Sequence, residues 1–152
     1  FKSEFGTTSG NYWIGNERLH QLTKDGRYKL RFDLQSSDNQ QWYWAEYNTF
    51  TVGDESSGYV LQVGGFSGNV SSDSGTDHGL MYLNGMKFTT KDRDNDVWGT
   101  NCAVDVGGGF WYLGCGYCYV NGDRGRGFYW LYLNNDQRLY RLQSSQMSLI
   151  CR

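Results

Sequence analysis

The sequence has 152 residues, about the size of one domain, and a formal net charge of −2 at pH 7. It has no basic stripe and therefore no electrostatic reason to bind nucleic acid, and no apolar run long enough to insert in a membrane. The opening segment is polar and Gly-rich, unlike a signal peptide. With 17% aromatic residues, 21 Gly and no Pro, the composition favours short strands and ordered loops.

Residues 11–23 predict a short helix. Asn16 belongs to the residue types that cap helix N-termini, and Leu19 and Leu22 follow it on one face. His20 lies in the same segment, where its simplest role is a structural hydrogen bond. We therefore expect one amphipathic helix before the first long strand.

Three strands are predicted next, and together they form an antiparallel meander. In residues 27–34 apolar and charged side chains alternate, as they do in a strand with one buried face. The other two strands are residues 42–52 and 58–66. No repeat and no linker divides the chain, so it is one domain in which residues 1–83 form the sheet-containing central part.

Gly, Ser and Asp dominate residues 67–79, which predicts a surface loop. Asn69 opens an Asn-Val-Ser sequon there, a glycosylation signal in secreted proteins. His78, in the same loop, is expected to be exposed. From residue 84 onward Gly is frequent and periodicity is weak, so we expect a loop-rich part held by cysteines or a metal.

An acidic loop places Asp92, Asp94 and Asp96 at every second position. Carboxylates this close repel one another unless a cation lies among them, and oxygen ligands in such a loop suit Ca²⁺. The loop is not an EF-hand, since it has no Glu at the twelfth position. A solvated acidic turn is the alternative. A zinc site is disfavoured because the chain has only two His.

The segment Cys-Gly-Tyr-Cys at 115–118 has three meanings: a redox pair, half of a zinc site, or cysteines of two different disulfides. A redox pair needs a following helix that lowers the thiol pKa, whereas a Gly-rich turn follows here. A zinc site needs a second spaced pair, and Cys102 and Cys151 are isolated in sequence. No acid/base pair is recognisable either. We therefore expect no enzyme activity.

Several segments together, in this order, resemble the fibrinogen-like recognition domains, which include ficolins and tachylectin-type lectins. The matching segments cover nearly the whole chain: FGTTSGNYWIGNERLHQLT, YVLQVGGFSGN, LNGMKFTTKDRDNDVWGTNCA, GGFWYLGC, VNG and LYRLQSSQM. The resemblance implies an α+β fold, a twisted, mostly antiparallel sheet with short helices. It also implies a loop-rich, disulfide- and calcium-stabilised C-terminal subdomain at residues 84–152. The family's upstream lobe is not in this sequence, which is expected for either a trimmed domain or a naturally shortened one; if the lobe is missing from the protein, an oligomer partner is expected to cover the sheet edge.

The resemblance also implies a calcium site. Asp94 and Asp96 would be its side-chain ligands, the backbone carbonyls near Trp98 and Thr100 would complete it, and Asp92 would act through water.

Next to this site the resemblance implies a disulfide from Cys102 to Cys115, which leaves Cys118 and Cys151. A second disulfide between these two is our first expectation, with an intermolecular link as its competitor. Family members often have a cis peptide bond before the second cysteine, here Gly114–Cys115.

In the family's lectins, N–H groups around that cysteine bind an N-acetyl carbonyl between tyrosine walls. Here the donors would be Cys115 and Gly116, on a rim that includes Gly114 and Tyr117. The pattern departs from those lectins at Val106, where Tyr is frequent, and at Gly116, where His is frequent.

The segment at 123–127 is also shortened, and it normally supplies a second pocket Tyr. Tyr132 is a candidate substitute in this rim. Arg124 and Arg126 suit an anionic sugar or phosphate, with a solvated turn as the alternative.

We therefore predict a secreted, extracellular, calcium-dependent lectin-like domain of innate immunity, which binds glycans or acetylated groups on microbial surfaces. Homo-oligomers would add avidity. The alternative is an adhesion or receptor-ligand module that binds protein without sugar specificity. A thiol oxidoreductase, the third class, would need reactive thiols at 115 and 118.

Overall fold

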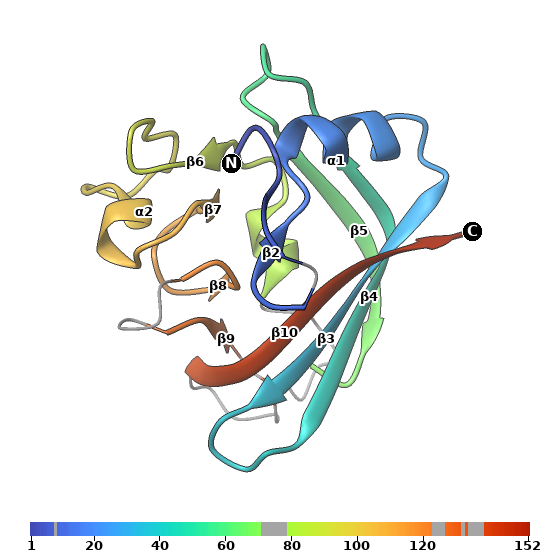
Figure 1. Ribbon diagram of the computed structural model, residues 1–152, viewed down its shortest axis with the longest axis vertical. Helices are drawn as coiled ribbons and strands as arrows, with labels where there is room; N and C mark the ends of the chain where they lie inside the picture. The colour runs from blue at the N-terminus through green and yellow to red at the C-terminus, as the bar shows by residue number, and fades with distance from the viewer. Residues whose placement is uncertain (8, 71–78, 123–126, 132, 134–138) are drawn as a thin grey trace.

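The computed structural model describes residues 1–7, 9–70, 79–122, 127–131, 133 and 139–152. Its main sheet has six antiparallel strands in the order β5-β4-β3-β10-β9-β8 (Figure 1). The strands of this sheet are β3 (Tyr28–Ser36), β4 (Trp42–Val52), β5 (Leu61–Gly68), β8 (Cys118–Tyr119), β9 (Tyr129–Leu131) and β10 (Leu139–Cys151).

The remaining elements are short. Two small sheets pair β1 (Phe5–Gly6) with β2 (Tyr12–Trp13) and β6 (Phe88–Thr89) with β7 (Phe110–Trp111). The helices are α1 (Asn16–Thr23), the 3-10 helix η1 (Leu80–Leu83) and α2 (Cys102–Asp105). The predicted fold class, a mostly antiparallel sheet with short helices, is confirmed. Among the described residues, no helix has the length and apolar character needed to cross a membrane.

The alternating pattern of β3 determines which face of the sheet is buried. Leu30, Phe32 and Leu34 are fully buried, whereas the charged residues between them are half-exposed on the other face. β4 and β5 follow as the predicted meander. The prediction for these three strands is therefore confirmed, with β5 beginning and ending slightly later than expected.

Among the described residues after 84 the elements before β10 are all short, as predicted, but β10 is the longest strand and was not predicted. β10 lies in the middle of the sheet, between β3 and β9. A bulge between Leu142 and Ser144 shifts its register by one residue. As a result Leu142 and Met147 face the same side although they are an odd number of residues apart, and the sequence shows no continuous alternation.

The first turn of α1 differs from the prediction. Its N-cap residue is Gly15, with φ of 93°, rather than Asn16. The Asn16 side chain is buried and accepts a hydrogen bond from the Trp13 indole N–H at 3.0 Å. A Cβ at residue 15 would lie 2.7 Å from the carbonyl carbon of Ser3, so Gly is required at this close approach. The structural hydrogen bond expected for His20 is present, between Nδ1 and the Val52 carbonyl at 2.8 Å.

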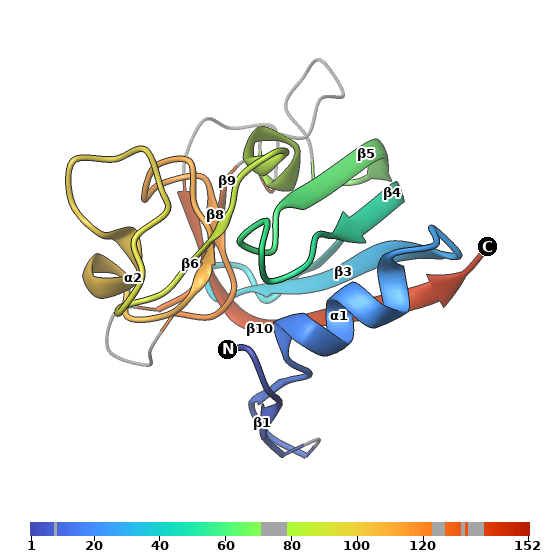
Figure 2. The same ribbon diagram turned by 90° about the horizontal axis from the view of Figure 1, so that it is seen from above.

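A large aromatic cluster joins the sheet to the C-terminal lobe, which contains β6 to β9 and α2. Trp111 is fully buried at its centre, with ring centroids 5.0 Å from Phe88 and 6.2 Å from Trp13. In the view from above, this lobe lies beside the long strands β3, β4 and β5 (Figure 2). The core therefore fixes the position of the loops that the lobe carries.

Candidate functional site

The acidic loop after β6 is held by side chains at both ends. Asn95 donates from its carboxamide to the Phe88 carbonyl at 2.7 Å, and its N–H donates to the Thr89 hydroxyl at 3.1 Å. At the far end Asn101 donates to the Thr90 carbonyl at 3.0 Å and caps α2 by accepting from the Val104 N–H. Side-chain hydrogen bonds thus fix the loop at several points, although it forms no long β-strand pairing.

Of the three carboxylates predicted to bind calcium, Asp96 is the most tightly held. Its two oxygens accept from the N–H groups of Trp98 at 2.9 Å and Cys102 at 3.0 Å. Asp94 accepts from the Asp96 N–H at 3.2 Å, and Asp92 accepts from a threonine hydroxyl outside this pair. Burial raises the pKa of Asp96, and the negative charge of Asp94 raises it further, whereas the two backbone donors lower it.

This arrangement fits a cation better than it fits a bare acidic turn. Two carboxylates close enough to raise a pKa repel each other, and a bound cation would remove that repulsion. In the described part of the chain no three His, Cys, Asp or Glu side chains gather as a metal cluster. Ca²⁺ would therefore depend on Asp94, Asp96 and backbone carbonyls, and those of Trp98 and Thr100 stay a prediction.

The disulfide predicted between Cys102 and Cys115 is present, and it joins the start of α2 to the loop after β7. The predicted cis bond at Gly114–Cys115 is wrong, since the described residues contain no cis peptide bond.

The predicted disulfide between Cys118 and Cys151 is also wrong, because both residues lie outside any disulfide. Cys118 on β8 and Tyr140 on β10 both lie opposite Trp130 of β9, one on each side of it. Cys151 lies eleven residues farther along β10, roughly 36 Å away at the rise of an extended strand. A disulfide requires Cα atoms within about 7 Å.

Exposed apolar side chains surround the Cys102–Cys115 disulfide. Val97 is 68% exposed, Trp98 62% and Val104 48%. A Cβ built at Gly114 would lie 3.3 Å from the Trp98 ring, so this ring lies directly against the Gly114 backbone. We call Val97, Trp98, Val104, Gly114 and Gly116 the disulfide-loop surface.

The predicted acetyl-binding rim is only partly visible. Gly116 is exposed with open space beside it, and the N–H groups of Cys115 and Gly116 donate to no other described residue. Tyr117 stacks on Tyr82, with ring centroids 5.2 Å apart and planes 10° apart. Val106 is buried and lies beneath the surface rather than on it.

Arg124, Arg126, Tyr132 and His78 lie outside the described residues. Sequence reasoning missed Tyr82 and the Trp98 side chain. The available signal was an adjacent Val and Trp inside an acidic loop, where apolar residues have no core to fill.

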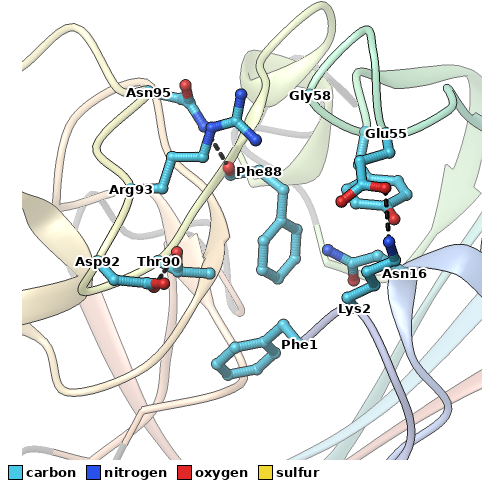
Figure 3. Close-up of a pocket in the computed structure, with 11 residues that line it drawn as sticks. Phe1, Lys2, Asn16, Glu55, Gly58, Phe88, Thr90, Asp92, Arg93 and Asn95 are labelled. Carbon is cyan, nitrogen blue, oxygen red and sulfur yellow. Dashed lines mark hydrogen bonds and ion pairs between the residues drawn. The ribbon is translucent and has the colours of Figure 1, made fainter.

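A cleft of about 200 Å³ lies on the other side of the acidic loop (Figure 3). Arg93 and Asn95 line one side of it, and Lys2 and Glu55 form a 2.6 Å ion pair on the other. The Phe1 ring lies between these sides, 5.4 Å from the Phe88 ring. Phe1 and Phe88 are therefore the aromatic part of the lining of this cleft.

A curled antiparallel sheet with the long strand β10 in its middle, and an acidic loop that is followed directly by a disulfide-bonded cysteine, characterise this fold. Residues 1–150 match the family model described as fibrinogen beta and gamma chains, C-terminal globular domain. The chain belongs to this fibrinogen-like family.

Among curated relatives, it is 41% identical over 125 residues to tenascin-R of Gallus gallus, covering 82% of this chain and 9% of the relative. It is 37% identical over 147 residues to fibrinogen-like protein A of Apostichopus parvimensis, covering 90% of this chain and 50% of that protein. The chain thus spans half or less of these relatives.

Solved structures agree with the fold. The fibrinogen-like globe domain of human ANGPTL2 has a TM-score of 0.77 at 32% identity, over 99% of this chain and 70% of that chain. A lamprey fibrin D-dimer, solved with the peptide ligand Gly-His-Arg-Pro-amide, has a TM-score of 0.67 at 27% identity. That match covers 97% of this chain and 53% of the other.

Proposed function

We propose that this domain is a secreted, non-enzymatic recognition module that binds a protein or peptide partner through the disulfide-loop surface. The observation that carries the proposal is the exposure of Val97 and Trp98, at 68% and 62%, on a loop held by a disulfide and side-chain hydrogen bonds. Tenascin relatives and a peptide-bound relative support a protein partner over a sugar.

Physical reasoning supports the same surface. Tryptophan is enriched among the few residues that dominate protein interfaces, where truncation costs about 2 kcal/mol or more. An exposed Trp on a mobile loop would lose conformational entropy on binding, and pre-ordering reduces that cost. Here the Trp98 ring rests on Gly114, and the backbone N–H of Trp98 donates to Asp96, so both the ring and the backbone that carries it are held in place.

Secretion is part of the proposal because the Cys102–Cys115 disulfide requires an oxidising compartment. The function then consists of binding without turnover, in an extracellular setting.

We also propose that Ca²⁺ is the resident cation of the acidic loop. Asp94 and Asp96 would hold it, with backbone carbonyls near Trp98 and Thr100 and with Asp92 acting through water. When bound, Ca²⁺ would neutralise the carboxylate pair. The backbone N–H groups of Trp98 and Cys102 hold the Asp96 carboxylate in place. The bond from Cys102 also connects the acidic loop to the disulfide.

A second candidate function is recognition of acetylated glycans, and two observations favour it. The N–H groups at Cys115 and Gly116 face no described acceptor, and the stacked Tyr82 and Tyr117 rings lie in the same part of the lobe. An acetyl carbonyl could accept from such donors while its methyl packs on an aromatic ring.

Selection of a displayed peptide library on the immobilised domain tests the first proposal. The buffer contains calcium at a roughly millimolar concentration, which suits extracellular modules. We expect enriched peptides whose binding weakens at least about tenfold in Trp98→Ala, since truncation of an interface Trp costs about 2 kcal/mol. Trp42→Ala is the matched control because Trp42 is 54% exposed on a distant strand.

The same variants on a glycan array separate the two candidates. Acetylated sugars bound by the wild type, with no peptide enriched, would replace the first proposal by the second. Equal peptide binding by the wild type and Trp98→Ala would remove the disulfide-loop surface from the proposal.

A further inference from the structure

Two tryptophans lie on the face of the sheet opposite the core. Side chains alternate along β4, so Trp42 and Trp44 face away from the buried Ala45 and Tyr47. Trp42 is exposed, and Trp44 is half-buried with the Arg31 guanidinium 5.1 Å from its ring centroid. An aromatic pair on an outer face is a surface that an attached or bound group can cover.

Asn69 lies directly opposite Trp44 and continues the ladder past the end of β5. Its N–H donates to the Trp44 carbonyl at 3.1 Å, and its side-chain Oδ1 accepts from the Trp44 N–H at 2.6 Å. A Cβ at Gly68 would lie 2.4 Å from the Trp44 carbonyl oxygen. Glycine at 68 is therefore what allows Asn69 to approach β4 so closely.

This pairing fixes the carboxamide through its oxygen. Asn69 is exposed, and its Nδ2 donates no hydrogen bond to any residue of the described ranges. In sequence, Asn69 begins Asn-Val-Ser, although Ser71 lies outside the described residues. Nδ2 is the atom that carries an N-linked glycan in a secreted protein.

The neighbouring charges on this face neutralise one another. Arg31 donates to Asp33 and to Glu46, and Lys29 donates to the other Glu46 oxygen at 2.6 Å. Two cations thus face two carboxylates. A covering group needs no charge of its own, which suits a neutral sugar and disfavours a strongly anionic or cationic ligand.

We propose that Asn69 carries an N-linked glycan whose first sugar packs against the rings of Trp44 and Trp42. Opposite residues in a ladder have Cβ atoms about 5 Å apart, so a sugar on Nδ2 is within reach of Trp44. Trp42 lies about 7 Å farther along β4. The apolar C–H face of a pyranose packs on an indole as other apolar groups do.

The covalent step is an ordinary glycosyl transfer from a lipid-linked pyrophosphate oligosaccharide. The bond from Nδ2 to the first sugar carbon forms, the bond from that carbon to the pyrophosphate oxygen breaks, and Nδ2 loses one proton. The proposal rests on secretion, as proposed above, because the donor and its transferase belong to the secretory pathway.

The test uses the full chain expressed in a secretory host that makes high-mannose glycans. The wild type is expected to gain the mass of one glycan, which peptide-N-glycosidase removes. Ser71→Ala is the matched variant, since it abolishes the sequon but keeps Asn69 and both of its bonds to Trp44. This variant is expected to lack the added mass.

Hydroxyl-radical labelling then reports packing. We expect Trp42 to be oxidised about twofold more slowly in the glycosylated protein, because covering one ring face removes about half of its exposed area. Trimming to a single sugar should keep this protection, Ser71→Ala should lose it, and Trp98 should react equally in all samples.

Absence of the added mass, or equal oxidation of Trp42 and Trp44 in the wild type and Ser71→Ala, overturns the proposal. Peptide binding through Trp98 can be measured on Ser71→Ala in parallel. A failure here is therefore distinguishable from a failure of the proposed recognition function.

Discussion

The indole N–H of Trp111 donates to the carbonyl of Tyr59 at 2.7 Å, across 52 positions of sequence and inside the core. Tyr59 lies two residues before the sheet strand β5, and Trp111 ends β7 in the C-terminal lobe. This hydrogen bond joins the main sheet to the C-terminal lobe, which carries the acidic loop and the disulfide. Its loss is therefore expected to loosen both.

Trp111→Phe removes the donor and leaves a cavity in the core. We expect a loss of about 3 kcal/mol in the free energy of unfolding, measured by urea denaturation. Trp98→Phe is the control, because an exposed ring makes a change of about 0.5 kcal/mol or less. Equal effects of the two substitutions would contradict the role assigned to Trp111.

The Cys102–Cys115 disulfide closes a loop of 13 residues in sequence separation. Replacing both cysteines with Ser is expected to cost about 3 kcal/mol, because the unfolded chain regains the entropy of that loop. Cys151→Ser, exposed at the end of β10, should change stability by about 0.5 kcal/mol or less. Urea denaturation of the three proteins compares them, and a double variant as stable as the wild type would refute the expectation.

Calcium is expected to raise the melting temperature of an EDTA-treated sample. At a calcium concentration of about 100 times Kd the stabilisation is about 2.7 kcal/mol. Asp94→Asn should lose this increment while keeping its acceptor for the Asp96 N–H, and Asp92→Asn should keep most of it. An identical melting curve in EDTA and in calcium would remove the metal from the proposed function.

Glu46 gives a prediction for pH. The hydrogen bond from Lys29 and that from Arg31 lower its pKa. Because the folded-state pKa lies below the unfolded value of about 4.3, the ionised form contributes stability above pH 4.3 and loses it as pH falls through the folded pKa.

Glu46→Gln should therefore cost about 1 kcal/mol at pH 7, and the difference from the wild type should shrink toward zero in stronger acid. Urea denaturation at pH 7, 4 and 3 measures this difference (these values bracket the ordinary carboxyl range of about 4). Glu55→Gln is the control, since its ion pair with Lys2 is exposed and exposed ion pairs contribute little to stability. A difference for Glu46 that stays constant with pH would contradict the mechanism.

Local patterns in the sequence were sufficient for the first half of the fold. In β3 every second residue is apolar, so the strand and its buried face follow directly from the order of side chains. β10 could not be recognised in the same way, since its bulge interrupts the alternation after Leu142. The wrong Cys118–Cys151 pairing has the same origin, because the distance between these residues depends on the course of β10.

The candidate site was predictable where a motif carries the information. The acidic loop was predicted from the spacing of its carboxylates and the Cys102–Cys115 pair from the family resemblance, and the pair is present. The exposure of Trp98 was not predictable, since a Trp in an unknown loop is as compatible with burial as with display. The structure shows that the Trp98 ring packs with one side against Gly114 and is largely exposed to solvent.

The central position of β10 has a consequence for biosynthesis. Its 13 residues are synthesised long after β3, and they lie between β3 and β9. Until they leave the ribosome, one edge of β3 has no partner and the sheet cannot close. The nascent meander would thus carry an open edge of the kind that pairs with other chains, and this domain should depend on chaperone protection until β10 has been inserted.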